Sequence, residues 1–176
     1  LRKKTAIVLQ DVFLFSDTIQ NNIAFGIEQG DASLDEVKIA ARDAHVAHNI
    51  EGFKAGYDTL LGERGVNLSG GQKQRISIAR AFIRRPQLLI LDDCLSAVDT
   101  ETEETILNSI RRRGNESAVL LVSHRISSIR GADHVLVLDG GRVVESGHPD
   151  ELASSGGLYS RMVEQQGQQN EGNEED

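Results

Sequence analysis

Two adjacent carboxylates, Asp92 and Asp93, follow an apolar run and are suited to holding a metal ion and moving a proton. In open parallel sheets, ligands bind beyond the carboxyl ends of the strands, so chemistry is expected just after each strand. Two other polar positions also follow apolar runs, namely Gln10 and the pair Ser123 and His124. Any one of them alone could be a solvent-facing turn, but the three together indicate a binding or catalytic site.

The string LSGGQKQR at 68–75 has the composition of an anion-binding helix start. Ser69 can cap the helix, while Gly70 and Gly71 leave backbone N–H groups accessible at the positive end of the helix dipole. Gln72 adds a neutral donor nearby. A plain glycine-rich turn is the alternative, but a match to five specified residues arises by chance in roughly one in ten thousand chains of this length. The string therefore predicts a phosphate receptor.

Composition excludes several other kinds of site. The chain has 19 Lys and Arg against 27 Asp and Glu, a formal charge of -8, which argues against a nucleic-acid partner. The single cysteine, Cys94, excludes an internal disulfide and cannot form a zinc site by itself, so oxygen and nitrogen groups must carry the chemistry. No apolar run approaches the roughly 18 residues of a membrane span. Any membrane link is expected from a partner or from sequence outside this chain.

The elements that position these residues are expected to form a parallel α/β sheet, because helical patterns separate the last three of four apolar runs. The predicted strands are residues 5–9, 88–91, 118–122 and 134–138. A helical element is expected at 102–113, and a turn leading into an edge strand at 140–147.

The long stretch between the first two strands shows no comparable apolar run and is expected to be a helical insert. Ser33 and Glu36 have the spacing of a capping box, which predicts a helix through about Ala44. A second helix should follow LSGG and stop before Pro86. Its buried face is predicted to include Ile76, Ala79 and Ile83.

Taken in order along the chain, these motifs resemble the nucleotide-binding domain of ATP-binding cassette (ABC) transporters. Residues 68–72 resemble the ABC signature, residues 88–92 the Walker B strand, and residues 96–99 the D-loop. Gln10 resembles the Q-loop glutamine, and His124 the switch histidine. The strings GERG at 62–65 and FLFSDTIQNNIAFG at 13–26 are similar to elements of exporters.

The resemblance implies a P-loop NTPase (RecA-like) parallel sheet with an inserted α-helical signature subdomain, present as a partial domain. The part of the nucleotide-binding domain is expected at 1–163, with a helical subdomain at about 16–86 and a RecA-like lobe at 1–15 and 87–163. Residues 164–176 are expected to be a disordered acidic tail, because QQGQQNEGNEED has no apolar side chain to bury.

The resemblance also implies a role for each motif residue, with ATP and Mg²⁺ as the cofactors. Asp92 and Gln10 would hold Mg²⁺, and Gln10 would also sense the γ-phosphate. His124 would donate to the γ-phosphate and help position the attacking water. Asp99 would reach across a dimer interface or cap the helix near Thr102, and the two roles are compatible. Contacts to ATP held by a second nucleotide-binding domain would come from Ser69, Gly70, Gly71 and Gln72.

Asp93 occupies the position where the family normally has a catalytic Glu, and its side chain is one methylene shorter. A general base must come within about 2.6–3.2 Å of its proton, so Asp93 is expected to be a poor base. An Asp here beside an intact LSGGQ resembles the slow half of a heterodimeric multidrug-type exporter.

The P-loop pattern G-x-x-x-x-G-K-[ST] is missing from the sequence. In the family it lies upstream together with the transmembrane domains, so the chain is expected to belong to a longer protein at the cytoplasmic face of the membrane. The chain alone is expected to be inactive. Two alternatives remain open: a soluble, non-transporting ABC ATPase, and a clamp that binds ATP with little hydrolysis.

Overall fold

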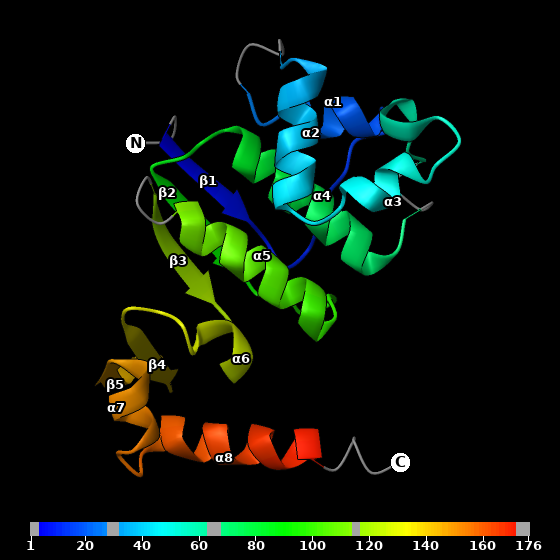
Figure 1. Cartoon of the computed structure of the whole chain (residues 1–176). Coiled ribbons are helices and arrows are strands. Elements are labelled where there is room, and N and C mark those ends of the chain that lie inside the picture. The colour runs from blue at the N-terminus through cyan, green and yellow to red at the C-terminus, as the bar shows by residue number, and fades with distance from the viewer. Residues whose placement is uncertain (1–3, 28–31, 63–67, 114–116, 172–176) are drawn as a thin grey trace. The chain divides into compact units, whose positions relative to one another are not determined.

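A computed structural model of the chain describes residues 4–27, 32–62, 68–113 and 117–171 (Figure 1). The chain divides into two compact units, Leu1–Val122 and Ser123–Asp176. The expected boundaries of the helical subdomain and the RecA-like lobe stay predictions.

The first unit contains a parallel sheet with the strand order β1-β2-β3, made of β1 (Thr5–Val8), β2 (Leu88–Asp92) and β3 (Ala118–Val122). Val8 pairs with Leu91, and Leu91 pairs with Leu121, so the carboxyl ends of all three strands lie at one edge. The parallel α/β sheet expected from the sequence is confirmed for these three strands.

The described part of the insert between β1 and β2 holds several helices, as predicted, together with connecting segments and an isolated bridge between Thr18 and Leu60. The helices are α1 (Ile19–Ala24), α2 (Leu34–Asp43), α3 (Ala47–Glu51), the 3₁₀ helix η2 (Gly56–Asp58) and α4 (Gly70–Ile83). The Ser33–Glu36 capping box is present at the start of α2. Helix α4 ends before Pro86 and buries Ile76, Ala79 and Ile83, which confirms the predicted face.

Helix α5 (Thr100–Arg113) follows β2 and contributes to the same hydrophobic core as the sheet. Ile106 and Ile110 of α5 are buried in one cluster with Leu89 and Leu91 of β2. Other apolar sheet side chains stay half exposed in the described part of the chain, among them Ile7 (55%), Leu120 (51%) and Val122 (48%). The sheet therefore leaves apolar surface that the described residues do not cover.

The described residues of the second unit, 123–171, form a β-hairpin and three helices. Its elements are α6 (Ile126–Ile129), β4 (Val135–Asp139), β5 (Arg142–Gly147), α7 (Pro149–Ala153) and α8 (Leu158–Glu171). The expectation that the run at 134–138 joins the parallel sheet is wrong, because β4 pairs antiparallel with β5. The reason is the turn: Gly140 and Gly141 both have positive φ (54° and 74°), which closes a tight local hairpin.

The expected disordered tail at 164–176 also needs correction, because α8 continues to Glu171. Leu158, Tyr159, Met162 and Val163 pack in the core of the second unit and anchor the helix. The Gln and Glu residues that follow have good helix propensity, so a helix already held by packing extends through them. Residues 172–176 lie outside the described part.

Candidate functional site

The two carboxylates at the end of β2 have different backbone geometry. Asp92 is the last residue of the strand and is half-buried, whereas Asp93 has a positive φ of 44°. Asp and Asn enter this left-handed region more readily than other non-glycine residues. The backbone N–H of Asp93 donates to the carbonyl of Val122 at 2.9 Å, which ties the turn to the neighbouring strand. The chain therefore leaves the sheet between the two carboxylates.

Gln10 lies two residues beyond β1, at the sheet edge where Asp92 ends β2. Its side chain is exposed. The described residues contain no group of three or more His, Cys, Asp or Glu able to hold a metal ion. Mg²⁺ commonly takes one or two protein carboxylates and completes its shell with water and substrate phosphates. Asp92 and Gln10 have the oxygen ligands that this kind of site uses, and their role at Mg²⁺ stays a prediction.

The LSGGQ string forms the N-terminus of α4, as predicted. The hydroxyl of Ser69 accepts the backbone N–H of Gln72 at 3.2 Å, and Oε1 of Gln72 accepts the N–H of Ser69 at 3.0 Å. This capping box uses the amide oxygen of Gln72, so the predicted donor role falls to its Nε2 group. The first N–H groups of a helix have no intrahelical acceptor, so Gly70 and Gly71 present donors at the positive helix end.

The start of α4 packs against Ala97, in the stretch at 96–99 that resembles the D-loop. A Cβ on Gly71 would lie 2.8 Å from the carbonyl oxygen of Ala97, so only glycine fits without a shift of the backbone. Oε1 of the buried Gln74 accepts the N–H of Ala97 at 3.2 Å. Two motifs that are far apart in the sequence are thus fixed to each other in the first unit.

Asp99 caps helix α5, which confirms one of its two expected roles. Its Oδ1 accepts the N–H of Thr102 at 2.9 Å. That hydrogen bond lowers the pKa of Asp99, and the nearby positive charge of Arg75 lowers it further. Arg75 itself donates to the carbonyl oxygens of Gly71 and His45. The role of Asp99 across a dimer interface stays a prediction.

Arg80 of α4 holds the segment that follows Gln10, a connection that sequence reasoning missed. Its guanidinium donates to the carbonyl of Phe13 at 2.9 Å, and to both the carbonyl (2.8 Å) and Oδ1 (2.9 Å) of Asn22. Burial lowers the pKa of Arg80 to about 10. The fully buried Asn22 also bonds the N–H and carbonyl of Phe15. The signal in the sequence that could have revealed this connection is Asn22, a polar residue on the apolar face of the predicted insert.

Ser123 and His124 open the second unit. The hydroxyl of Ser123 accepts the N–H of Arg125 at 3.0 Å, and the His124 side chain is exposed. Whether His124 acts together with the strand-end residues of the first unit stays a prediction. The exporter-like GERG string includes residues 63–65, which lie outside the described part.

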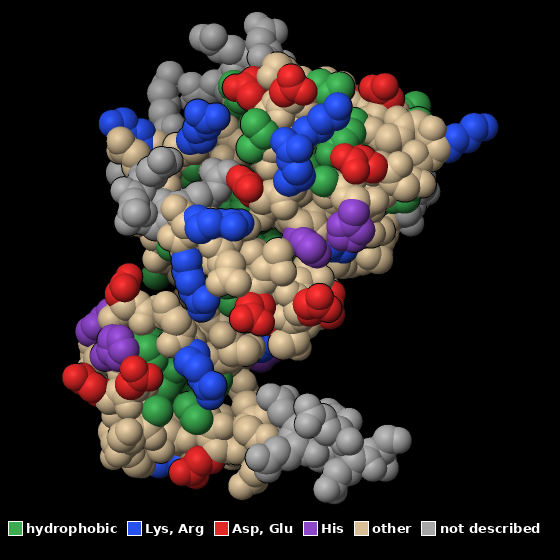
Figure 2. Space-filling view, in the orientation of Figure 1, with side chains coloured by type: hydrophobic (Ala, Val, Ile, Leu, Met, Phe, Trp, Pro, Cys, Tyr) green, Lys and Arg blue, Asp and Glu red, His purple; other side chains and the backbone are tan. Residues whose placement is uncertain are grey.

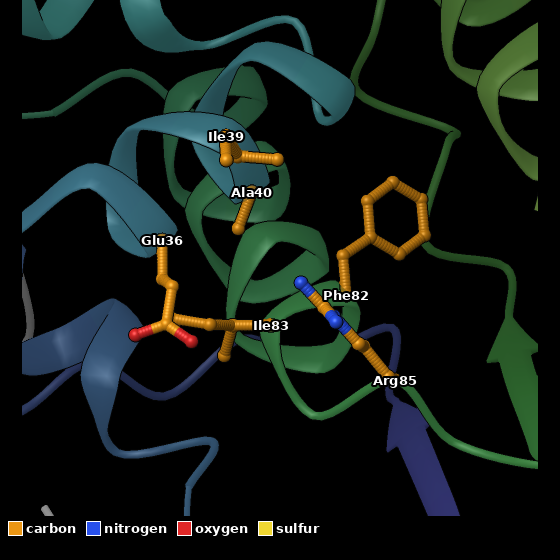
Figure 3. A pocket seen from close by; sticks show the side chains of 6 residues that line it. All are labelled: Glu36, Ile39, Ala40, Phe82, Ile83 and Arg85. Atoms are coloured by element: carbon orange, nitrogen blue, oxygen red, sulfur yellow. The ribbon is translucent and has the colours of Figure 1, made fainter. Parts of the chain in front are cut away.

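A small pocket between α2 and the end of α4 lies apart from all these motifs (Figure 3). It is lined by Glu36, Ile39, Ala40, Phe82, Ile83 and Arg85. The carboxylate of Glu36 is engaged in the capping box, whose hydrogen bonds from Ser33 lower its pKa. We therefore assign the pocket no part in the predicted chemistry.

Charges of both signs are interspersed on the face shown in Figure 2, where Lys and Arg side chains alternate with Asp and Glu. The expectation of no nucleic-acid partner stays a prediction. In the parts of the chain that the structure describes, every helix is too short or too polar to cross a membrane.

The ABC transporter family model matches residues 1–96 of the chain. The chain is 46% identical over 162 residues to the putative multidrug export ATP-binding/permease protein YgaD of Bacillus subtilis, covering 92% of this chain and 28% of that protein. It is 44% identical to the ATP-dependent lipid A-core flippase of Pasteurella multocida, with the same coverage of both chains.

Among solved structures, the chain resembles a bacterial Atm1-family ABC exporter with ATP bound. The TM-score is 0.90 at 43% identity, covering 94% of this chain and 29% of the exporter chain. The fold is therefore that of part of an ABC nucleotide-binding domain, with a parallel sheet and an inserted helical region. This chain, which spans less than a third of each relative, belongs to the ABC transporter family.

Proposed function

We propose that this chain is the ATP-hydrolysing part of an ABC exporter subunit, which couples ATP-driven closure of two nucleotide-binding domains to export of a substrate. The observation that carries the proposal is the arrangement in the first unit. The start of α4 is locked to the stretch at 96–98, while Asp92 and Gln10 share one sheet edge. Sequence identities above 40% to an export protein and a flippase support the same assignment.

Each motif residue then acts at one of two ATP sites. In the subunit's own site, Asp92 and Gln10 would hold Mg²⁺, which when bound would supply positive charge against the phosphates. Asp93 would accept the proton of the attacking water, and His124 would donate to the γ-phosphate. In the other site, Ser69, Gly70, Gly71 and Gln72 present the N-terminus of α4 to ATP held by the partner.

We further propose that the subunit's own site is the slow one and that the partner is a different nucleotide-binding domain. Asp93 has a short carboxylate on a backbone that turns away from the strand. A displaced base loses about 10²–10⁴ in rate, so hydrolysis would fall mainly to the site completed by this chain's signature. If both sites proved slow, the subunit would be the clamp that binds ATP with little hydrolysis.

Contact with the transmembrane domains is proposed for the aromatic segment after Gln10. Phe13 and Phe25 are 59% and 64% exposed, and both rings pack against Phe15. Arg80 holds this segment to α4, the helix that begins at the signature. A movement of Gln10 or of α4 would therefore be transmitted to these rings. The proposed location is the cytoplasmic face of a membrane, as part of an integral transporter.

The proposal is tested by steady-state ATP hydrolysis of the full-length transporter. Ser69→Arg places a bulky side chain at the α4 N-terminus and should impair turnover strongly, because it blocks the fast site. Asp93→Ala should have a smaller effect, since it removes a base that is already misplaced. The reverse ranking would mean that the two sites have been assigned the wrong way round.

The 176-residue chain by itself should show no magnesium-dependent ATP turnover. Its sequence lacks the phosphate-binding loop, which supplies much of the electrostatic binding of the nucleotide. Turnover above background with the purified chain would contradict this expectation. It would also show that these 176 residues form a complete ATP site.

A further inference from the structure

Helix α8 carries a polar residue into the segment that contains His124. Leu158, Tyr159, Met162 and Val163 pack in the core of the second unit, and Gln166 follows Val163 by three residues. Residues three and four apart share a helix face, so Gln166 continues the packed face. Its side chain is half-buried, whereas the neighbouring Gln165 is exposed.

The amide of Gln166 makes two hydrogen bonds to the backbone on either side of Arg125. Its Oε1 accepts the N–H of Ile126 at 2.8 Å, and its Nε2 donates to the carbonyl oxygen of His124 at 2.8 Å. The two bonds pair the side chain with the backbone much as a neighbouring strand would. They fix the peptide that follows His124.

Other contacts make this segment well defined. The N–H of Arg125 donates to Ser123 Oγ, and Ile126 is 3% exposed in the core of the second unit. Arg125 stands at the N-cap of α6 but provides no side-chain cap, so Gln166 supplies the acceptor for the first N–H of that helix. The His124 side chain is exposed, and the backbone that holds its Cα sets the direction in which the side chain starts.

We propose that Gln166 is a positioning residue for His124. By clamping the carbonyl of His124 and the N–H of Ile126, it sets the direction in which the imidazole leaves the backbone. This inference rests on the proposed role of His124 at the γ-phosphate. A helix at the end of the described chain would then control the geometry of hydrolysis without touching ATP.

The test uses single-turnover ATP hydrolysis by the full-length transporter, with the partner's catalytic glutamate changed to glutamine so that only this subunit's site reports. Gln166→Met keeps length and helix propensity but removes both hydrogen bonds. The maximal rate should fall about tenfold, because small displacements of a positioned group are costly, while the ATP concentration for half-maximal rate stays nearly constant. Gln166→Glu keeps the acceptor for Ile126 but places a second acceptor opposite the His124 carbonyl, so its maximal rate should also fall below that of the wild type. Gln165→Met is the matched control and should match the wild type.

A double-mutant cycle separates positioning from general stability. In a His124→Ala background, Gln166→Met should have no further effect on the maximal rate, since the group it positions is gone. Additive losses would overturn the inference and make Gln166 a structural residue. Amide hydrogen exchange adds a readout independent of ATP. The Ile126 amide should exchange faster in Gln166→Met than in the wild type, and at the wild-type rate in Gln165→Met.

The possible failures are distinguishable. If His124→Ala lowers the rate but Gln166→Met does not, the inference is wrong and the proposed function stands. If His124→Ala leaves the rate unchanged, the proposed role of His124 is wrong, and the positioning role fails with it. Unchanged exchange at Ile126 in Gln166→Met would overturn the clamp itself, whatever the rates.

Discussion

The side-chain oxygen of Gln74 accepts the backbone N–H of Ala97 at 3.2 Å and so joins the signature helix to the segment before α5. Gln74 is buried, whereas Ala97 is exposed. The hydrogen bond therefore links the interior of the first unit to a surface that the proposed second nucleotide-binding domain would contact. It gives the two motifs a fixed relationship before any partner binds.

Gln74→Met should weaken this relationship at little packing cost, because the two side chains have similar volume. We expect the free energy of unfolding to fall by about 1 kcal/mol, the usual net value of one hydrogen bond. Urea unfolding measures the change, with Gln87→Met as the control on an exposed side chain. Equal stability of Gln74→Met and the wild type would show that the bond contributes nothing to the fold.

The two glycines of the signature should respond differently to alanine. Gly71→Ala places its Cβ 2.8 Å from the Ala97 carbonyl oxygen, and the backbone must shift, which typically costs about 1–3 kcal/mol. At Gly70 the nearest atom is the Cβ of Ala97 at 3.7 Å, an ordinary contact. Gly70→Ala should leave the free energy of unfolding unchanged or raise it slightly, since alanine favours helix. Equal losses in urea unfolding would contradict the close approach at Gly71.

Sequence reasoning predicted the local elements well because their signals are local. The box at Ser33 and Glu36, the cap at Ser69 and the three parallel strands all follow from spacing and apolar runs. Sequence reasoning failed where the choice of neighbouring strand decides how a strand pairs. The run at 134–138 is equally apolar in a parallel sheet or a hairpin, and the pair Gly140–Gly141 made the hairpin.

The polar contacts between elements were not predictable in the same way. Arg80, Gln74 and Gln166 each bond backbone groups that lie far away in the sequence. Composition marked the end of the chain as unable to bury apolar surface. The side chain of Gln166 finds its place because Tyr159 and Val163 already hold α8. The spacing of these residues by three and four was the signal that the helix continues.

The cap at Asp99 predicts how the stability of the first unit depends on pH. The hydrogen bond from Thr102 lowers the folded-state pKa of Asp99 below its unfolded value of 3.8. The ionised carboxylate therefore stabilises the folded chain above about pH 4, and that contribution is lost as the pH falls through the lowered folded pKa. The stability difference between the wild type and Asp99→Ala, measured by urea unfolding, should shrink from pH 6 to pH 3.

Asp99→Asn provides the control, because asparagine caps helices well but does not titrate in this range. The difference between Asp99→Asn and Asp99→Ala should stay constant over the same pH values. A difference between wild type and Asp99→Ala that is equally constant would show that the charge of Asp99 does not contribute to the cap.

The shorter carboxylate at Asp93 can be tested by restoring the methylene. In the single-site assay of the full-length transporter, Asp93→Glu should raise the rate of hydrolysis, because the longer side chain can reach the attacking water. The upper bound is a factor of about 10²–10⁴, the usual worth of a positioned base. The left-handed backbone limits the gain: a longer side chain at φ 44° is less favourable than Asp, and the free energy of unfolding should fall by up to about 1 kcal/mol.

Asp93→Asn is the matched variant, since asparagine tolerates the same backbone but has no carboxylate. It should tolerate the turn better than Asp93→Glu and hydrolyse ATP no faster than the wild type. The rates of the three proteins therefore separate the reach of the base from the shape of the turn. If Asp93→Glu binds ATP and folds but hydrolyses it at the wild-type rate, base length does not limit this site. The slow step would then lie in the partner's signature, which must close on the same ATP.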